Sequence, residues 1–241
     1  MFISTPTTCH FPNNKKAFTL SEVLITLVII GVISAISIPT LFTSWQKTQT
    51  VTALKKAYSE LTQAVKYSEI ENGNISTWDF DLKLEDFFEK YLKSYVKLSK
   101  NNLSNVITDT KYYGCDGKPI YGRLSTFGYS SKAVALNSGM LLIFDGSATN
   151  NYYKTIAVDI NGLKKPNKLG RDVFIFAIHN TEGVVAHKFK ANMPEIPNNI
   201  RRTRNELKNG DSLACSKTKY GNWCAALIMY DGWEIKKDYP W

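Results

Sequence analysis

Histidine is scarce in this sequence, which has three, at positions 10, 179 and 187. The chain also lacks the Gly-x-Ser-x-Gly motif of hydrolases, the His-Glu-x-x-His motif of zinc proteases and a glycine-rich phosphate-binding loop. These absences argue against hydrolysis, zinc catalysis and nucleotide chemistry built on known motifs. We predict that the protein is not an enzyme. The enzymatic alternative, a hydrolase of a new kind, would require a pocket in which titratable groups converge.

Long apolar runs are missing after Leu41, but one lies before it. From Phe18 to Leu41, Glu22 is the only charged residue in 24 positions. About 20 residues at 1.5 Å each are enough for a helix to cross the hydrocarbon of a bilayer. The sequence therefore predicts one N-terminal membrane crossing, followed by about 200 residues of soluble protein.

Acidic residues are absent from Met1 to Ser21, whereas Lys15 and Lys16 directly precede the apolar run. Positively charged flanks stay on the cytoplasmic side of a membrane-spanning segment. We therefore expect the first 17 residues to lie in the cytoplasm and the C-terminal body to lie outside it.

The net charge of +9 raises the question of nucleic-acid binding, which requires basic residues to cluster. The tight cluster in this chain consists of Arg201, Arg202, Arg204 and Lys208. Its helical spacing is typical of a solvated helix face, and the expected topology places it away from chromosomal DNA. We predict no nucleic-acid partner.

Three kinds of N-terminal segment could explain the apolar run. A secretory signal peptide has an apolar core of about 7–15 residues followed by a small-x-small cleavage site, and Ile33-Ser34-Ala35 is a poor site of that kind. An uncleaved signal anchor fits the length. It leaves Glu22 unexplained, because a carboxylate within a membrane costs on the order of 2.5–3.5 kcal/mol.

The third kind is carried by Lys15-Lys16-Ala17 followed by Phe18-Thr-Leu-Ser-Glu22-Val-Leu. This stretch resembles the processing motif of type IV prepilins and type II secretion pseudopilins, and the resemblance covers about 25 residues. It implies that a membrane peptidase cuts between Ala17 and Phe18 and that Phe18 is then N-methylated. The residue before the cut is usually glycine in this family, and here it is Ala17.

The same resemblance assigns roles to Glu22 and Pro39, at the fifth and twenty-second mature positions. A carboxylate in a water-poor filament core needs a cationic partner, and the amine of Phe18, from the same or a neighbouring subunit, would supply it. Such a pair would also favour one axial register of the subunits. Pro39 lacks a backbone donor, so it would bend or melt the helix, unless it simply marks the end of the membrane-spanning part.

An amphipathic helix is predicted after Pro39, because apolar side chains recur at intervals of three or four: Val51, Leu54, Tyr58, Leu61 and Val65. Gly73 is a suitable C-terminal stop. We therefore expect one helix from Phe18 to about Asn72. Its first half would lie in the membrane and its second half against a globular head.

Further elements follow from apolar patterning and turn residues. We expect helices at Leu84–Leu98 and Asn198–Lys208, a hairpin at Lys132–Asp145, and strands at Thr155–Ile160, Asp172–Ile178 and Val184–Lys190. The predicted fold is α+β and pilin-like: a long N-terminal helix packed on an antiparallel sheet of four to five strands.

The four cysteines are Cys9, in the leader, and Cys115, Cys215 and Cys224 in the body. In an oxidising compartment the last two predict a disulfide that closes a small loop, and the alternative is two buried free thiols. Such a tail, with its aromatic residues, is similar to the disulfide-bounded tail of many pilins. Cys115 has no assigned role.

A calcium site is suggested by the segment from Asp159 to Asp172. Asp159, Asn161 and Asp172 supply oxygen atoms around a glycine turn, and some pseudopilins bind calcium between late strands. The segment also holds four basic residues and lacks a terminal glutamate. The alternative is therefore an ordered turn without a metal, and no other cofactor is expected.

Together these observations predict a minor pilin or a pseudopilin. Residues 1–17 would be a cleaved cytoplasmic leader, 18–41 the transmembrane or filament-core helix, and 42–241 a periplasmic or extracellular head. The resemblance implies as partners other pilin or pseudopilin subunits, the prepilin peptidase, an inner-membrane assembly platform and, before assembly, the lipid bilayer. The rival outside this family is an uncleaved single-pass membrane protein with an external binding head.

Overall fold

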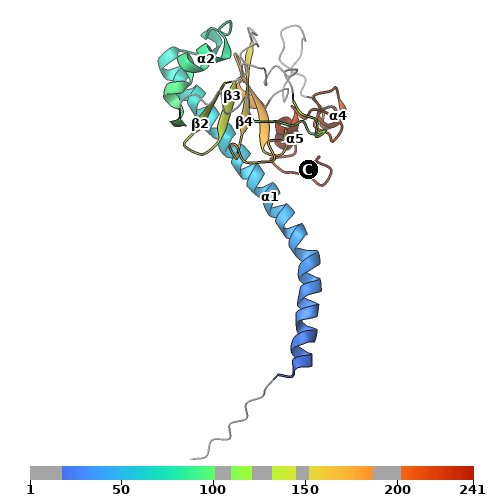
Figure 1. The fold of residues 1–241 in the computed structure, drawn as a ribbon. Helices are drawn as coiled ribbons and strands as arrows, with labels where there is room; N and C mark the ends of the chain where they lie inside the picture. Colours follow the sequence, from blue (N-terminus) through green and yellow to red (C-terminus); the bar gives the residue numbers. More distant parts are fainter. Residues whose placement is uncertain (1–17, 101–109, 121–131, 145–151, 187–201) are drawn as a thin grey trace, which may run out of the picture. The chain divides into compact units, whose positions relative to one another are not determined.

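A computed structural model describes residues 18–100, 110–120, 132–144, 152–186 and 202–241 (Figure 1). The chain divides into two compact units, Met1–Trp45 and Gln46–Trp241. We describe each unit by itself.

Helix α1 runs from Leu20 to Asn72 and contains Pro39 in its interior. The proline therefore does not end the helix, although it leaves the carbonyl of Ala35 without an amide donor from the next turn. The hydroxyl of Thr43 donates to the carbonyl of Pro39 at 2.9 Å. At the far end, Gly73 follows with φ +79°, the left-handed conformation that terminates many helices.

The part of α1 in the first unit is apolar on all sides. Its large hydrophobic side chains are exposed, including Ile25, Val28, Ile29, Ile33 and Ile36. In the described part of the chain, α1 is the one helix long and apolar enough to cross a membrane. This composition is what a helix surrounded by lipid or by other apolar helices requires.

The part of α1 in the second unit has one buried face. Leu54, Leu61 and Val65 have at most 2% of their surface exposed, as the periodicity predicts. Next come a short 3-10 turn (Ile75–Thr77), helix α2 (Leu84–Tyr91) and a second 3-10 turn (Lys93–Tyr95). The helix predicted at Leu84–Leu98 thus ends earlier, at Tyr91, whose ring stacks on Trp78 with centroids 4.5 Å apart.

The described part of the head contains a single antiparallel sheet of six strands, in which each strand pairs with the next one along the chain. The strands are β1 (Leu98–Lys100), β2 (Lys132–Leu136), β3 (Leu141–Phe144), β4 (Tyr153–Asp159), β5 (Val173–His179) and β6 (Gly183–Ala186). The sequence predicted four to five strands. The strand it missed, β1, has only three residues, which is too short to show the alternation of a strand.

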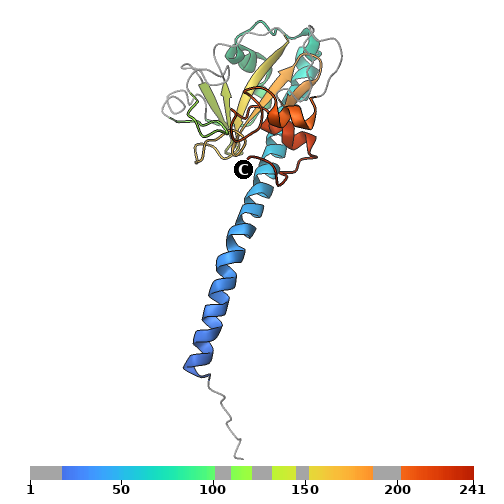
Figure 2. The ribbon, with the colours of Figure 1, turned by 90° about the vertical axis from the view of Figure 1, so that its right-hand side faces the viewer.

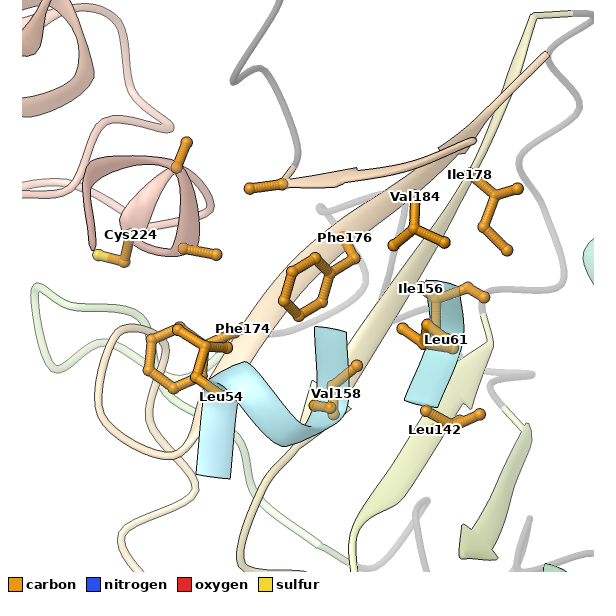
Figure 3. Close-up of a cluster of buried hydrophobic side chains, with 14 of the residues drawn as sticks. Leu54, Leu61, Leu142, Ile156, Val158, Phe174, Phe176, Ile178, Val184 and Cys224 are labelled. Carbon is orange, nitrogen blue, oxygen red and sulfur yellow. The ribbon is translucent and has the colours of Figure 1, made fainter. Parts of the chain in front are cut away.

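Both faces of the central strands are buried, so β4 and β5 show no exposed side. One face packs on α1 through Ile156, Val158 and Phe176 (Figure 3). The opposite face, with Ile143 and Ile175, forms a second cluster that includes Tyr112 and Leu169.

Two short helices complete the described part of the head, α4 (Arg204–Asn209) and α5 (Cys224–Tyr230). Helix α5 packs on β5 and β6, and α4 packs on α5 (Figure 1, Figure 2). Residues 198–201 of the predicted polar helix lie outside the described residues, and α4 begins at Arg204, after a capping box formed by Thr203 and Glu206. The aromatic residues of the tail pack against the core, with Trp223 and Tyr239 buried and Trp233 and Trp241 partly buried.

Candidate functional site

Glu22 lies in the first turn of α1, where it caps the helix. Its Oε2 accepts hydrogen bonds from the amide of Thr19 at 2.9 Å and from the hydroxyl of Thr19 at 2.8 Å. In return, the amide of Glu22 donates to Thr19 Oγ1 at 3.2 Å. Thr19 and Glu22 thus form a capping box, which satisfies amides that the first turn would leave unpaired.

The capping box was readable in the sequence, because Thr19-Leu-Ser-Glu22 has its Thr-x-x-Glu spacing. The sequence predicted instead that Glu22 pairs with the amine of Phe18, with a tolerated polar residue near the membrane edge as the alternative. In the full sequence the nitrogen of Phe18 forms a peptide bond with Ala17, so the predicted pairing stays a prediction. Phe18 is 84% exposed, and Ala17 lies outside the described residues.

A second polar site lies in the loop between β4 and β5, where Asp159 ends one strand and Asp172 precedes the next. Both residues are buried. Asp172 accepts the amide of Lys168 at 2.6 Å and the amide of Asn167 at 2.7 Å. Asp159 accepts the amide of Asn161 at 3.2 Å, as in the turn that the sequence suggested. The two carboxylates therefore shape the loop.

Burial and neighbouring charge change the proton affinity of both carboxyl groups. Burial, together with the charge of Asp172, raises the pKa of Asp159 to about 8. Burial likewise raises the pKa of Asp172, against the effect of its backbone hydrogen bonds. The hydroxyl of Tyr112 donates to Asp159 Oδ2 at 3.3 Å, and burial followed by the Asp159 charge raises the pKa of Tyr112.

Two side-chain amides at this loop have buried oxygen atoms without a hydrogen-bond partner. They are Asn161 Oδ1 and Asn167 Oδ1. The amide nitrogen of Asn161 already donates to Asp172 Oδ2 at 3.2 Å. The structure thus brings together the three residues predicted for calcium, Asp159, Asn161 and Asp172, and adds Asn167. Their oxygen donors are of the kind that calcium prefers.

The same loop connects several parts of the head. Backbone hydrogen bonds join it to Tyr113, and the hydroxyl of Tyr239 donates to the carbonyl of Gly170 at 2.7 Å. The hydroxyl of Thr50, on α1, donates to the carbonyl of Arg171 at 3.4 Å. The Arg171 guanidinium lies 4.6 Å from the ring centre of Trp241. A change in the conformation of the loop would therefore alter its contacts with α1 and with the tail.

The basic cluster predicted from the sequence is largely engaged within the protein. Arg204 forms ion pairs with Asp231 and Asp238 at 2.7 Å, and Lys208 reaches Asp238 at 2.6 Å. The guanidinium of Arg202 lies 4.2 Å from the ring centre of Trp223, and residue 201 lies outside the described residues. These pairs give the described members of the cluster a structural role.

The cysteines of the tail are bonded as predicted, in a disulfide between Cys215 and Cys224. Cys115 is a buried thiol. Among the described residues, His179 faces the hydroxyl of Thr181 at 2.9 Å from Nδ1. The other two histidines, at positions 10 and 187, lie outside the described residues.

Residues 12–38 match the prokaryotic N-terminal methylation motif, which is the signal of type IV pilins and pseudopilins. With the apolar N-terminal helix and the antiparallel sheet, this match defines a pilin-like or pseudopilin-like protein and agrees with a single-pass membrane protein. Residues 40–241 match a second sequence family, and the chain belongs to it: a family of unknown function (DUF6613). No curated protein and no solved structure matches the chain.

Proposed function

We propose that this protein is a structural subunit, a minor pilin or a pseudopilin, of a type IV pilus or a type II secretion pseudopilus. A prepilin peptidase cuts the precursor between Ala17 and Phe18, and Phe18 is N-methylated. The subunit resides in the lipid bilayer until an inner-membrane assembly platform adds it to the filament. The observation that carries this proposal is the match of residues 12–38 to the methylation motif.

The proposed division of the chain follows from this route. Residues 1–17 are the cytoplasmic leader, 18–41 form the membrane-spanning and filament-core segment, and 42–241 form a head in the periplasm or on the cell surface.

Glu22 has a particular part in the proposed assembly. Lipid tails are as apolar as leucine, so moving the apolar helix from the bilayer into a filament gains little hydrophobic energy. A charged pair in a water-poor core, by contrast, depends strongly on geometry. Pairing of Glu22 with the Phe18 amine of the same or a neighbouring subunit would therefore select one register. The match to the motif and the place of Glu22 in the first turn support this role.

The experiment is an intact-mass and N-terminal peptide measurement on the protein recovered from membranes of its own host. We expect a chain that begins at N-methylated Phe18. A chain that retains Met1 to Ala17 and does not assemble would overturn the proposal. It would favour the rival protein with an uncleaved anchor and an external binding head.

We also propose that the loop between β4 and β5 binds calcium, through Asp159, Asn161 and Asp172. The observation in favour is the pair of buried carboxyl groups beside the unpartnered Oδ1 atom of Asn161. A bound Ca²⁺ would neutralise both carboxylates and accept the free amide oxygen as a ligand. Its role is structural: the loop joins α1 to the tail, and calcium would hold it in one conformation.

Calcium binding is tested by the thermal unfolding of the full-length protein in detergent, with millimolar Ca²⁺ and with a chelator. We expect Ca²⁺ to raise the melting temperature, and to raise it more at about pH 8 than at about pH 6, because the cation competes with the proton on Asp159. Asp159→Asn should lose this response. If Ca²⁺ does not change the melting temperature of the wild-type protein at either pH, the loop does not bind calcium and is an ordered turn without a metal.

A further inference from the structure

Three sulfur atoms meet inside the head, although the cysteines that carry them come from separate segments. We call Cys115, Cys215 and Cys224 the three-sulfur cluster, because their Sγ atoms all lie within 4.8 Å of one another. Cys115 Sγ lies 3.4 Å from Cys224 Sγ, which already belongs to the disulfide. The free thiol is thus in contact with a bonded sulfur atom.

The surrounding backbone leaves room for this contact. Gly170 and Gly221 have φ values of +79° and +94°, in the left-handed region that favours glycine. A Cβ atom at Gly170 would lie 2.7 Å from Cys224 Sγ and 2.9 Å from Cys115 Sγ. A Cβ atom at Gly221 would overlap Cys115 Sγ. Any side chain at either position would push the sulfur atoms apart.

Hydrogen bonds hold Cys115 in this place. Its thiol donates to the carbonyl of Leu169 at 3.0 Å, and its amide donates to the carbonyl of Tyr220 at 2.8 Å. The neighbouring carbonyl of Gly170 accepts a hydrogen bond from the hydroxyl of Tyr239. The thiol is thereby fixed beside the disulfide on both sides, by the loop between β4 and β5 and by the segment before α5.

We propose that Cys115 is an alternative disulfide partner of Cys224, so that the head can hold either the Cys215–Cys224 or the Cys115–Cys224 bond. In the exchange, Cys115 loses its proton and its sulfur attacks Cys224 Sγ. The Cys115–Cys224 bond forms while the bond to Cys215 breaks, and the electron pair leaves on Cys215 Sγ. Cys215 then takes the proton. The step is an isomerisation and needs neither an oxidant nor a reductant.

The two bonds constrain the chain differently. The observed disulfide closes a loop between residues nine apart, whereas the alternative would join residues 109 apart. A longer closed loop removes more freedom from the unfolded chain. The exchange would therefore convert a local bond in the tail into a covalent link between the tail and the segment next to the sheet.

The exchange is slow in the folded protein at neutral pH. Burial raises the pKa of the Cys115 thiol to about 12, so only a small fraction is present as the reactive thiolate. A rise in pH or a local opening of the loop would increase that fraction. The cluster is thus a device whose bond changes when the packing around Gly170 and Gly221 loosens.

The test uses the full-length protein in detergent, isolated without reductant and incubated at about pH 7 and about pH 9. After an acid quench and denaturation, free thiols are alkylated and identified by peptide mass. We expect alkylated Cys215 to accumulate roughly tenfold faster per pH unit, because both values lie below the pKa of Cys115. Alkylation of Cys115 alone among the three, at both pH values, would overturn the proposal.

Two variants make the result specific. Cys115→Ala removes the attacking thiol and should show no alkylated Cys215 under the same conditions. Cys215→Ala, treated with oxidised glutathione, should form the Cys115–Cys224 bond. If Cys215→Ala keeps the wild-type circular dichroism spectrum and still carries two free thiols after this treatment, Cys115 is not a partner. If this variant does not fold, the wild-type measurement decides alone.

Discussion

Glu22 combines two properties that separate substitutions can distinguish. As the fourth residue of the capping box it needs only a side-chain acceptor, whereas pairing with an amine needs a negative charge. Glutamine keeps the acceptor and removes the charge. The residue thus allows helix capping and assembly to be tested independently.

We expect Glu22→Gln to insert into the membrane and to keep a capped α1, yet to enter filaments several-fold less than the wild-type protein. Glu22→Ala should also lose the acceptor for the amide and the hydroxyl of Thr19, while the amide of residue 22 still donates to Thr19 Oγ1. Quantitative blotting of sheared filaments against the membrane fraction measures incorporation. Wild-type incorporation of Glu22→Gln would show that charge pairing is not required.

Asp159 makes the stability of the head depend on pH in an unusual direction. In the unfolded chain a carboxyl group loses its proton near pH 4, but in the folded head Asp159 keeps it until about pH 8. Between these values the unfolded state binds fewer protons than the folded state. The contribution of Asp159 is therefore fully present below about pH 4 and is lost as the pH rises to about 8.

We expect Asp159→Asn to weaken this dependence by at least about 1 kcal/mol between pH 4.5 and pH 7.5. Asparagine mimics the protonated carboxyl group and does not titrate. Denaturant unfolding of the full-length protein in detergent, without calcium, measures the effect. The matched control is Glu234→Gln, an exposed residue of the tail, which should follow the wild-type profile. An unchanged slope in Asp159→Asn would contradict the buried, protonated state.

At the scale of elements, α1 in the second unit contributes one face to the hydrophobic core. Leu61 is 1% exposed, whereas Ile70 on the same helix is 79% exposed. Removing apolar atoms from a packed site costs transfer free energy and leaves a cavity, and neither cost applies at an exposed site. The two positions therefore form a matched pair.

We expect Leu61→Ala to lower the free energy of unfolding by about 2–5 kcal/mol and Ile70→Ala to change it by less than about 0.5 kcal/mol. Chemical denaturation of the two full-length variants in the same detergent gives the difference. Equal effects would mean that the buried face of α1 is not where the structure places it.

Whether an element could be predicted from the sequence depends on its length. The 3.6-residue period from Leu54 to Val65 extends over three turns and predicted a buried face that the structure confirms. A segment as short as β1, or a helix such as α2 that ends at an aromatic stack, is set by contacts with distant residues. The local pattern of apolar and polar residues does not predict such contacts, so it does not predict where these two elements end.

The polar sites divide in the same way. Asp159, Asn161 and Asp172 could be grouped from their spacing in the chain, and the structure brings the three residues together, while calcium binding stays a prediction. Asn167 and the contact of Cys115 with Cys224 were missed. The cysteine contact depends on folding that joins residues 109 positions apart. Asn167 lies within the same segment as the two aspartates, and its place depends on the backbone conformation of the loop, in which its amide donates to Asp172.

At the scale of the whole molecule, the proposed maturation depends on one small residue, Ala17. The resemblance to prepilins places this residue where a peptidase must accept a small side chain. We expect Ala17→Trp to block cleavage and filament incorporation completely, and Ala17→Gly to be processed at least as fast as the wild-type protein. N-terminal peptide mass from host membranes checks both. Normal trimming of Ala17→Trp would contradict the proposed cleavage site.

The neighbour-to-neighbour order of the sheet has a consequence for export. In the proposed topology the head crosses the membrane from α1 onwards, so each new strand emerges to find its pairing partner already outside. No described strand needs, for its first pairing, a strand that is still in the cytoplasm. Pairing of each strand as it emerges would therefore oppose backward movement of the chain through the membrane. The cysteines at positions 215 and 224 would follow after all six described strands had crossed.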